Sequence, residues 1–298
     1  MLSQRTAACG RAAVSGLLLL ILAGIAWAGG EPVDPSRGLL FAFERGEGRA
    51  SHLFGTIHSD DPRVLDLPAP VAEAFGAARA LVLEVTPDPV TLIDAAALTM
   101  LPPGDDLGNV VGQELYREVV AAAARRNLPA AFVGRLRPWA VATLLSLPAM
   151  DQARVLDLTL YTAALARQLP VSGLESPVEQ LAAFDALSHA QQVELLQHAL
   201  RNEAELPNQY RELIEAYLAR DLAKLVRLAD EAMGPGSGND AFGKALIGDR
   251  NQRMAEGIER LAGEGGGLFV AVGALHLPGE EGLVQSLRRR GFNVWLVH

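Results

Sequence analysis

Hydrophobic positions along the chain fall into two patterns. Short continuous apolar runs predict buried strands, and most of them lie near the two ends of the chain. These runs are residues 38–43, 52–57, 80–85, 169–176, 268–272 and 292–297. The first two flank the turn-forming residues 45–49, so we expect them to form a hairpin.

Between these ends, apolar residues recur at helical spacing over most of the chain. They predict a long helical insert, at about 106–262, with a flexible break at 234–240. Shorter helices are expected at 69–79 and 280–290. The resulting fold class is α/β (α+β): a small central mixed sheet built from two βαβ-like halves at the chain ends, with the helical insert between them.

The first residues predict a targeting segment. Arg5 and Arg11 precede an apolar run that ends in Ala26-Trp27-Ala28, the pattern of a secretory signal peptide. We therefore expect a signal peptide at 1–28 and a single domain at 29–298, in a protein exported to the periplasm or the extracellular space. The alternative is an uncleaved N-terminal anchor, which would then be the protein's contact with a membrane.

Charge and cysteine content exclude several classes. The net charge is −9, and removal of Arg5 and Arg11 would make the remainder more acidic, so we expect no nucleic-acid partner. The single cysteine, Cys9, lies inside the predicted signal peptide, so the mature protein would have no disulfide. These features leave the oligomeric state open.

Four titratable residues stand where predicted strands end: His58, Glu84, Glu175 and His276. Ligands of α/β sheets bind at the carboxyl ends of the strands, and two imidazoles with two carboxylates suit zinc, manganese or cobalt. Each residue also has an ordinary interpretation. The histidines could be loop residues, and Glu175 could favour the start of the following helix. Glu84 is hardest to explain in that way, because it lies inside an apolar run.

Several neighbours of these residues are further candidates. Gly55 and Gly273 each precede a histidine by three residues, where glycine permits a sharp turn or a close approach. Arg250 and Asn251 begin a predicted helix and could either face solvent or reach the cleft. Arg137 has the same two interpretations.

With these segments in order, the chain resembles the TraB/GumN family, which is related to the Tiki metalloproteases, over about 38–297. The resemblance rests on "LFGTIHSD", "LVLEV", "LPPGDDL", "RLRPWA", "GLESPVEQLAAFDAL", "DRNQRMA" and "VGALHLPGEEGL". It implies a divalent metal held by His58, His276 and Glu84, with manganese or cobalt favoured and zinc as a further choice. It also implies peptide cleavage, with Glu175 and Arg250 as supporting residues.

Three functional hypotheses follow. The first is an exported metal-dependent hydrolase that cleaves peptide bonds, with Glu84 as a ligand or as the base, and Glu175 as the acid or as a group that orients a histidine. The second is a non-catalytic protein that binds a peptide or small ligand in the same cleft. The third, suggested by the GumN name, is a structural partner in envelope polysaccharide export.

Overall fold

A computed structural model describes residues 36–148, 154–233 and 241–298. These residues belong to one compact unit, Asp34–His298. The predicted signal peptide at 1–28 lies outside the described residues. Within the described ranges, no helix is both long and apolar enough to cross a membrane.

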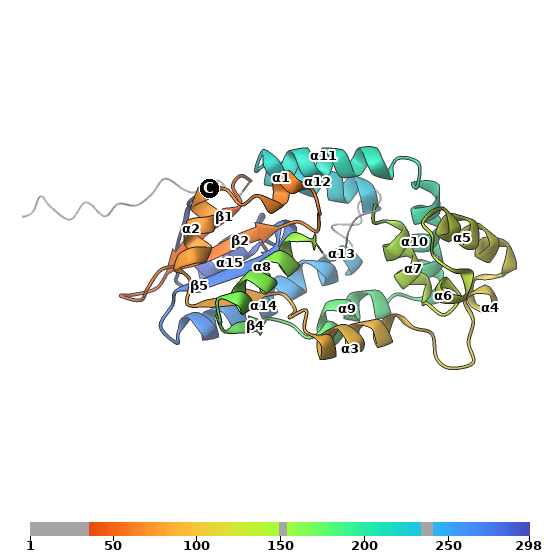
Figure 1. The fold of residues 1–298 in the computed structure, drawn as a ribbon, viewed down its shortest axis with the longest axis horizontal. Coiled ribbons are helices and arrows are strands. Elements are labelled where there is room, and N and C mark those ends of the chain that lie inside the picture. The colour runs from red at the N-terminus through yellow and green to blue at the C-terminus, as the bar shows by residue number, and fades with distance from the viewer. Residues whose placement is uncertain (1–35, 149–153, 234–240) are drawn as a thin grey trace, which may run out of the picture. The chain divides into compact units, whose positions relative to one another are not determined.

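The six short apolar runs form the six strands of one mixed sheet, as predicted (Figure 1). The strands are β1 Leu40–Glu44, β2 Ser51–Thr56, β3 Ala80–Leu83, β4 Val171–Gly173, β5 Leu268–Gly273 and β6 Asn293–Leu296. Their order is β4-β3-β5-β2-β1-β6. β1 is antiparallel to β2 and β6, whereas β2, β5, β3 and β4 are parallel to one another.

The two expected halves are interleaved in the sheet. β5 from the C-terminal half pairs with both β2 and β3 of the N-terminal half. Likewise, β2 and β1 separate β5 from β6. Each half is therefore a split β-α-β unit, and neither could complete its own strand pairing alone.

The helices are α1 Pro62–Leu65, α2 Ala69–Ala77, α3 Pro89–Thr99, α4 Leu107–Val111, α5 Gln113–Arg125, α6 Ala130–Val133, α7 Pro138–Leu145, α8 Leu156–Ala166, α9 Pro177–Asp185, α10 His189–Arg201, α11 Leu206–Leu218, α12 Leu222–Met233, α13 Ala241–Leu246, α14 Gly248–Ala262 and α15 Leu283–Arg289, with a short 3₁₀ helix η3 at Ala274–His276. The helical insert is confirmed, but helices begin earlier than predicted, with α3. Pro89 in the first turn and an Asp88 cap that accepts from the N–H groups of Val90 and Thr91 start this helix directly after the strand-ending segment.

The middle helices have a core of their own. Side chains from α4 to α7 and from α10 form a buried apolar cluster that includes Leu107, Val119, Trp139 and Leu196. α7 and α10 pack against each other here. This core makes the insert a structural body rather than a loop over the sheet.

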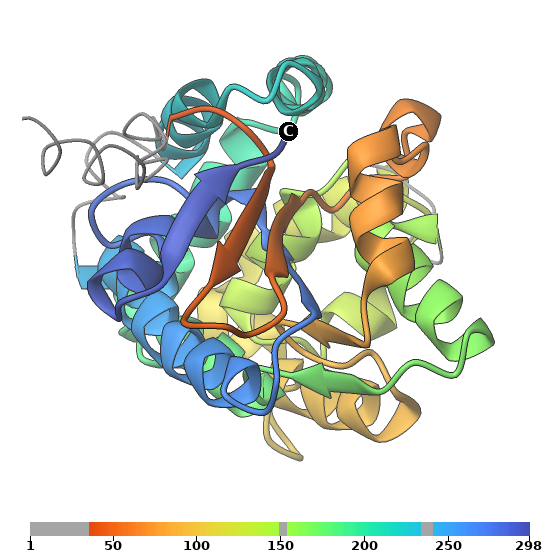
Figure 2. The same cartoon turned by 90° about the vertical axis from the view of Figure 1, so that its left-hand side faces the viewer.

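The sheet has a switch point between its parallel neighbours β2 and β5. From β2 the chain passes through α1 and α2 to β3, and from β5 it passes through η3 and α15 to β6, in the opposite direction across the sheet. Right-handed crossovers then place α2 and α15 on opposite faces, as Figure 2 shows. The departing segments leave a crevice at the carboxyl ends of these strands, where ligands of α/β sheets bind.

Candidate functional site

The carboxyl ends of the strands bring the predicted residues into one region. Glu84 directly follows β3, Glu175 follows β4 by two residues, and His276 ends η3 after β5. Register pairs β3 with both β4 and β5, so these side chains meet. His58 follows β2 by two residues, at the same end of the sheet, and its side chain is exposed.

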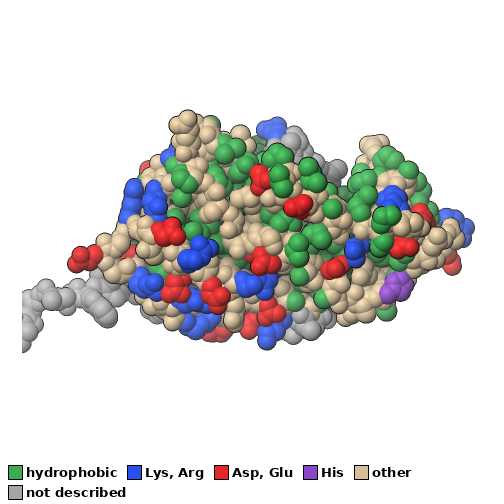
Figure 3. Space-filling view, turned by 90° about the horizontal axis from the view of Figure 1, so that it is seen from below, with side chains coloured by type: hydrophobic (Ala, Val, Ile, Leu, Met, Phe, Trp, Pro, Cys, Tyr) green, Lys and Arg blue, Asp and Glu red, His purple; other side chains and the backbone are tan. Residues whose placement is uncertain are grey.

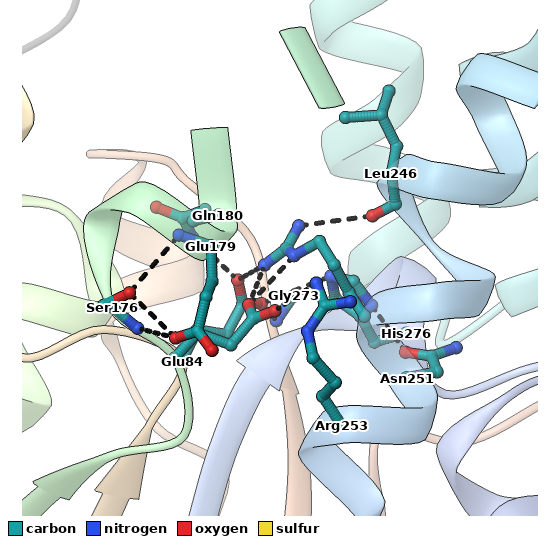
Figure 4. A network of polar contacts seen from close by, with 11 residues as sticks. Glu84, Ser176, Glu179, Gln180, Leu246, Asn251, Arg253, Gly273 and His276 are labelled. Atoms are coloured by element: carbon teal, nitrogen blue, oxygen red, sulfur yellow. Dashed lines mark hydrogen bonds and ion pairs between the residues drawn. The ribbon is translucent and has the colours of Figure 1, made fainter. Parts of the chain in front are cut away.

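Arg250 is the centre of a buried ionic cluster. Figure 4 shows the polar network around Glu84, Gly273 and His276 to which this cluster belongs. Its Nη2 donates to Glu84 Oε2 at 2.6 Å, and its Nε donates to Glu175 Oε2 at 2.9 Å. Arg253 also donates to Glu175, at 3.4 Å. Arg250, in the first turn of α14, thus supplies the positive charge that the largely buried Glu84 and Glu175 carboxylates require. Arg250 is therefore buried against these carboxylates rather than facing solvent.

Glu84 uses both oxygens. Oε1 accepts from the Gly273 N–H at 2.6 Å, and Oε2 accepts from Arg250 and from Gln180 Nε2 at 3.1 Å. Burial alone would raise the pKa of this carboxyl, but the charge of a protonated His276, the Arg250 charge and the hydrogen bonds from Gly273 and Arg250 together lower it, so the pKa of Glu84 lies below its ordinary value. Glu84 is therefore an ionised carboxylate fixed in one position.

His276 is buried and oriented by Asn251. Its Nδ1 lies 2.7 Å from Asn251 Oδ1, and the Asn251 amide NH₂ donates to the Glu281 carbonyl. This pairing makes Nδ1 the protonated nitrogen, so the Nε2 lone pair faces Glu84 Oε1 at 3.6 Å. Burial lowers the pKa of His276 to about 4, with Glu84 opposing the shift. At neutral pH this imidazole is uncharged, as a metal ligand must be.

The two glycines serve close approach rather than a left-handed turn. A Cβ on Gly273 would lie 3.2 Å from Glu84 Oε1, and its φ is −53°. A Cβ on Gly55 would lie 2.6 Å from a Leu277 methyl and 3.0 Å from the Ala274 backbone. Each glycine lets the segment after β5 pack tightly against its neighbours.

A cavity of about 540 Å³ opens at the crevice. His58, Glu84 and Asp157 supply its ionisable groups, and Leu92 and Gln180 are among its other lining residues. The sequence did not single out Asp157 or Gln180. Asp157 resembles an ordinary acid in the first turn of α8, and Gln180 an ordinary polar residue of α9; only the folded chain turns them toward the strand ends.

Asp157 faces the cavity from α8. Thr56 Oγ1 donates to its Oδ1 at 2.8 Å. Burial raises the pKa of Asp157, and the nearby Glu84 charge raises it further, whereas the Thr56 hydrogen bond and His58 lower it. The crevice therefore holds two carboxylates whose mutual repulsion is only partly relieved by the side chains around them.

Arg137 lies elsewhere. Its Nε donates to the Met100 carbonyl at 3.2 Å, and its Nη1 donates to Asp185 Oδ1 at 2.7 Å. Met100 follows α3 and Asp185 ends α9. Arg137 thus joins the ends of α3 and α9, and it is not among the residues that line the cavity.

The fold and these side chains define a mixed α/β protein with an acidic and imidazole-lined cavity at the switch point of its sheet. The sequence model of the TraB/PrgY/gumN family matches residues 39–295. The chain belongs to this family.

Curated relatives are Metalloprotease TIKI1 of Homo sapiens, 27% identical, and Metalloprotease TIKI2 of Xenopus tropicalis, 28% identical. Both matches cover 82% of this chain, but 59% and 57% of the respective relatives. The chain thus spans less than two thirds of the relatives it matches. No solved structure matches it. At the level of the family, the names of these relatives support metal-dependent proteolysis.

The donor types at the crevice suit a divalent metal. His58, Glu84 and Asp157 line the cavity, and His276 Nε2 presents its lone pair beside Glu84. A cation would also relieve the repulsion between the two carboxylates. Among the described residues, however, no three such donors are already gathered as a metal-binding group. The chemistry fits, and binding would have to complete the arrangement.

Proposed function

We propose that the protein is an exported, metal-dependent hydrolase that cleaves peptide bonds. The observation that carries this proposal is that His58 and Glu84 line one cavity at the switch point of the sheet, with His276 Nε2 3.6 Å from Glu84 Oε1. The family and the metalloprotease relatives support the same reaction class.

His58, Glu84 and His276 would hold the metal, with Asp157 as a further oxygen donor on the opposite side. Manganese or cobalt is favoured, and zinc is the other choice. When bound, the metal would lower the pKa of a water molecule and polarise a carbonyl group. Asn251 keeps the His276 Nε2 lone pair toward the site, which is the role that outer partners of metal-bound histidines commonly have.

Arg250 and Glu175 would act through Glu84 rather than on the substrate. Arg250 holds Glu84 by a 2.6 Å contact, and Glu175 holds Arg250 from its other side. Glu175 is paired with Arg250 and Arg253, not with a histidine. This arrangement keeps Glu84 ionised and aimed at the cavity, either to bind the metal or to accept a proton from water.

Metal content tests this proposal. We would purify the full chain without chelator or nickel affinity and measure bound metals in wild type, His58→Ala and His276→Ala. His189→Ala, on the first turn of α10, is the matched control for loss of an imidazole. We expect about one or two divalent ions per wild-type chain, retained in the control and lost in both site variants.

Peptide-library cleavage with and without chelator then tests catalysis. Metal-dependent cleavage that is absent from both site variants supports the hydrolase. Wild-type cleavage in either site variant, or no metal in wild type after manganese and cobalt are added, would reject it.

The second candidate is a non-catalytic protein that binds a peptide in the same cavity. The observation that favours it is the Arg250 cation, which already occupies one side of Glu84 where a metal would need the carboxylate. It predicts peptide binding that persists in chelator, with no cleavage under any metal condition.

Export rests on residues 1–28 of the sequence. Mass spectrometry of the protein recovered from the host's cell envelope tests it. A mature chain that begins after Ala28 supports the signal peptide, whereas an intact N-terminus in the membrane fraction supports the anchor.

A further inference from the structure

Helix α3 is apolar, yet none of its side chains is fully buried. Val90, Leu92 and Ile93 are 69%, 55% and 68% exposed, and Val178 on the neighbouring α9 is 60% exposed. α3 and α9 pack side by side. We call Val90, Leu92, Ile93 and Val178 the α3–α9 apolar surface. Figure 3, seen from the side on which these helices lie in Figure 1, shows green apolar side chains exposed among charged ones on this face.

This surface continues into the cavity. Leu92 belongs both to the surface and to the cavity lining, which it shares with Glu84 and His58. α9 also lines the cavity, through Gln180, but Val178 lies on another side of α9 because residues two apart on a helix do not face each other. Val90 and Ile93, three positions apart, lie on a common side of α3, and Ile93 is next to Leu92 in the chain. Leu92 therefore joins the cavity lining to the apolar side chains exposed on α3.

The surface is held in place at both ends. At the start of α3, Asp88 accepts from the Val90 and Thr91 N–H groups and from the Thr91 hydroxyl at 2.6 Å. Beyond its end, Arg137 ties the Met100 carbonyl to Asp185 of α9. Such anchoring fixes the helix that carries these side chains before any partner binds, which reduces the entropic cost of binding.

We propose that the α3–α9 apolar surface binds an extended, apolar segment of the peptide substrate that lies next to the bond in the cavity. The proposal rests on the hydrolase function above and adds the substrate class: peptides with apolar residues on one side of the cleaved bond. Large apolar side chains exposed together on one face can mark a binding site.

Three observations favour a peptide chain as the occupant. First, Leu92 belongs to both the surface and the cavity lining, so an extended chain can contact Leu92 and reach Glu84 at once, whereas a bilayer surface cannot enter the cavity. Second, Asp94 is the single charged residue within α3, so the surface matches an apolar partner better than a basic one. Third, the eleven residues of α3 rise by about 16 Å, the span of about five extended residues.

The test is binding of two fluorescein-labelled peptides of equal length and equal end charges. One has valine and leucine across its centre, and the other has serine and glutamine there. Fluorescence anisotropy is measured on the full chain in chelator, so that cleavage cannot interfere. The variant is Val90→Gln with Ile93→Gln, and the matched control is Leu165→Gln, an exposed apolar residue of α8.

We expect wild type and the control to bind the apolar peptide about tenfold more tightly than the polar one, and the double variant to lose that preference. Circular dichroism confirms that the double variant is folded. Equal binding of both peptides by wild type, or unchanged preference in the folded double variant, overturns the proposal. If the double substitution instead abolishes sedimentation with phosphatidylcholine vesicles or a wild-type dimer, the surface serves a membrane or a second copy and the proposal is also overturned.

This test separates the two proposals. If wild type prefers the apolar peptide but shows no metal-dependent cleavage, the proposed binding surface stands and the hydrolase function is rejected. Cleavage that the double variant performs on both peptides as wild type does would retain the hydrolase and reject the binding surface.

Discussion

The two Gly-x-x-His segments have similar sequences but different environments. His276 is 4% exposed and fixed by Asn251 and Glu84, whereas His58 is exposed at the cavity. One side of the crevice is thus a closed polar cluster with fixed side chains, and the other is open. A repeated motif can thus place a buried, hydrogen-bonded histidine after one strand and an exposed histidine after its parallel neighbour.

The largest expected effect comes from breaking the closed side with Arg250→Ala. This change leaves Glu84 without its cation and Glu175 with only its 3.4 Å contact to Arg253, so we expect the free energy of unfolding to fall by about 3–5 kcal/mol. Urea denaturation measures it. Arg63→Ala, which breaks exposed pairs with Asp61 and Glu215, is the control and should leave the unfolding curve near that of wild type. A midpoint for Arg250→Ala as high as that of Arg63→Ala would show that the cluster is not stabilising.

The next effect is the pH dependence of the metal-free protein. The pKa of His276 is about 4 in the fold and 6.5 in the unfolded reference, so the unfolded chain takes up the proton first as the pH falls. Stability should therefore be fully present above about pH 6.5 and decrease down to about pH 4, by at most about 3 kcal/mol.

Urea denaturation across this range, with chelator present, measures the slope. The same series on His276→Ala should be flatter, because the titrating imidazole is gone. An equally steep slope in His276→Ala would assign the pH dependence to other groups.

The smallest effect compares the two histidines directly. His276→Ala removes a buried ring and leaves the Asn251 carbonyl oxygen unpaired, so we expect a loss of about 1–3 kcal/mol. His58→Ala removes an exposed ring and should change stability by at most about 0.5 kcal/mol. Thermal unfolding of both variants, compared with His189→Ala, sharpens the comparison. Equal losses for His58→Ala and His276→Ala would mean that the open side is as constrained as the closed one.

Local sequence was informative where one residue conflicted with its surroundings. Glu84 lies in an apolar run of the sequence and so requires a partner, which the structure supplies as Arg250. A glycine before each histidine indicates close packing, and both glycines have close neighbours. Asp157 and Gln180 carry no such conflict, because an acid in a first turn and a glutamine on a helix are ordinary. From the sequence, Arg137 could either face solvent or reach the cleft. In the structure it instead links the segment after α3 to the end of α9.

The sequence by itself determined the strands, the helical insert and the titratable residues at strand ends, because periodicity and burial preference act over a few neighbouring residues. Tertiary structure alone decided the interleaved order of the strands and the pairing of Arg250 with two carboxylates. It also decided the difference between His58 and His276, and the exposure of α3. Each of these depends on contacts between segments far apart in the chain, such as β2 with β5 and α14 with β3, and local pattern carries no information about which distant segments will meet.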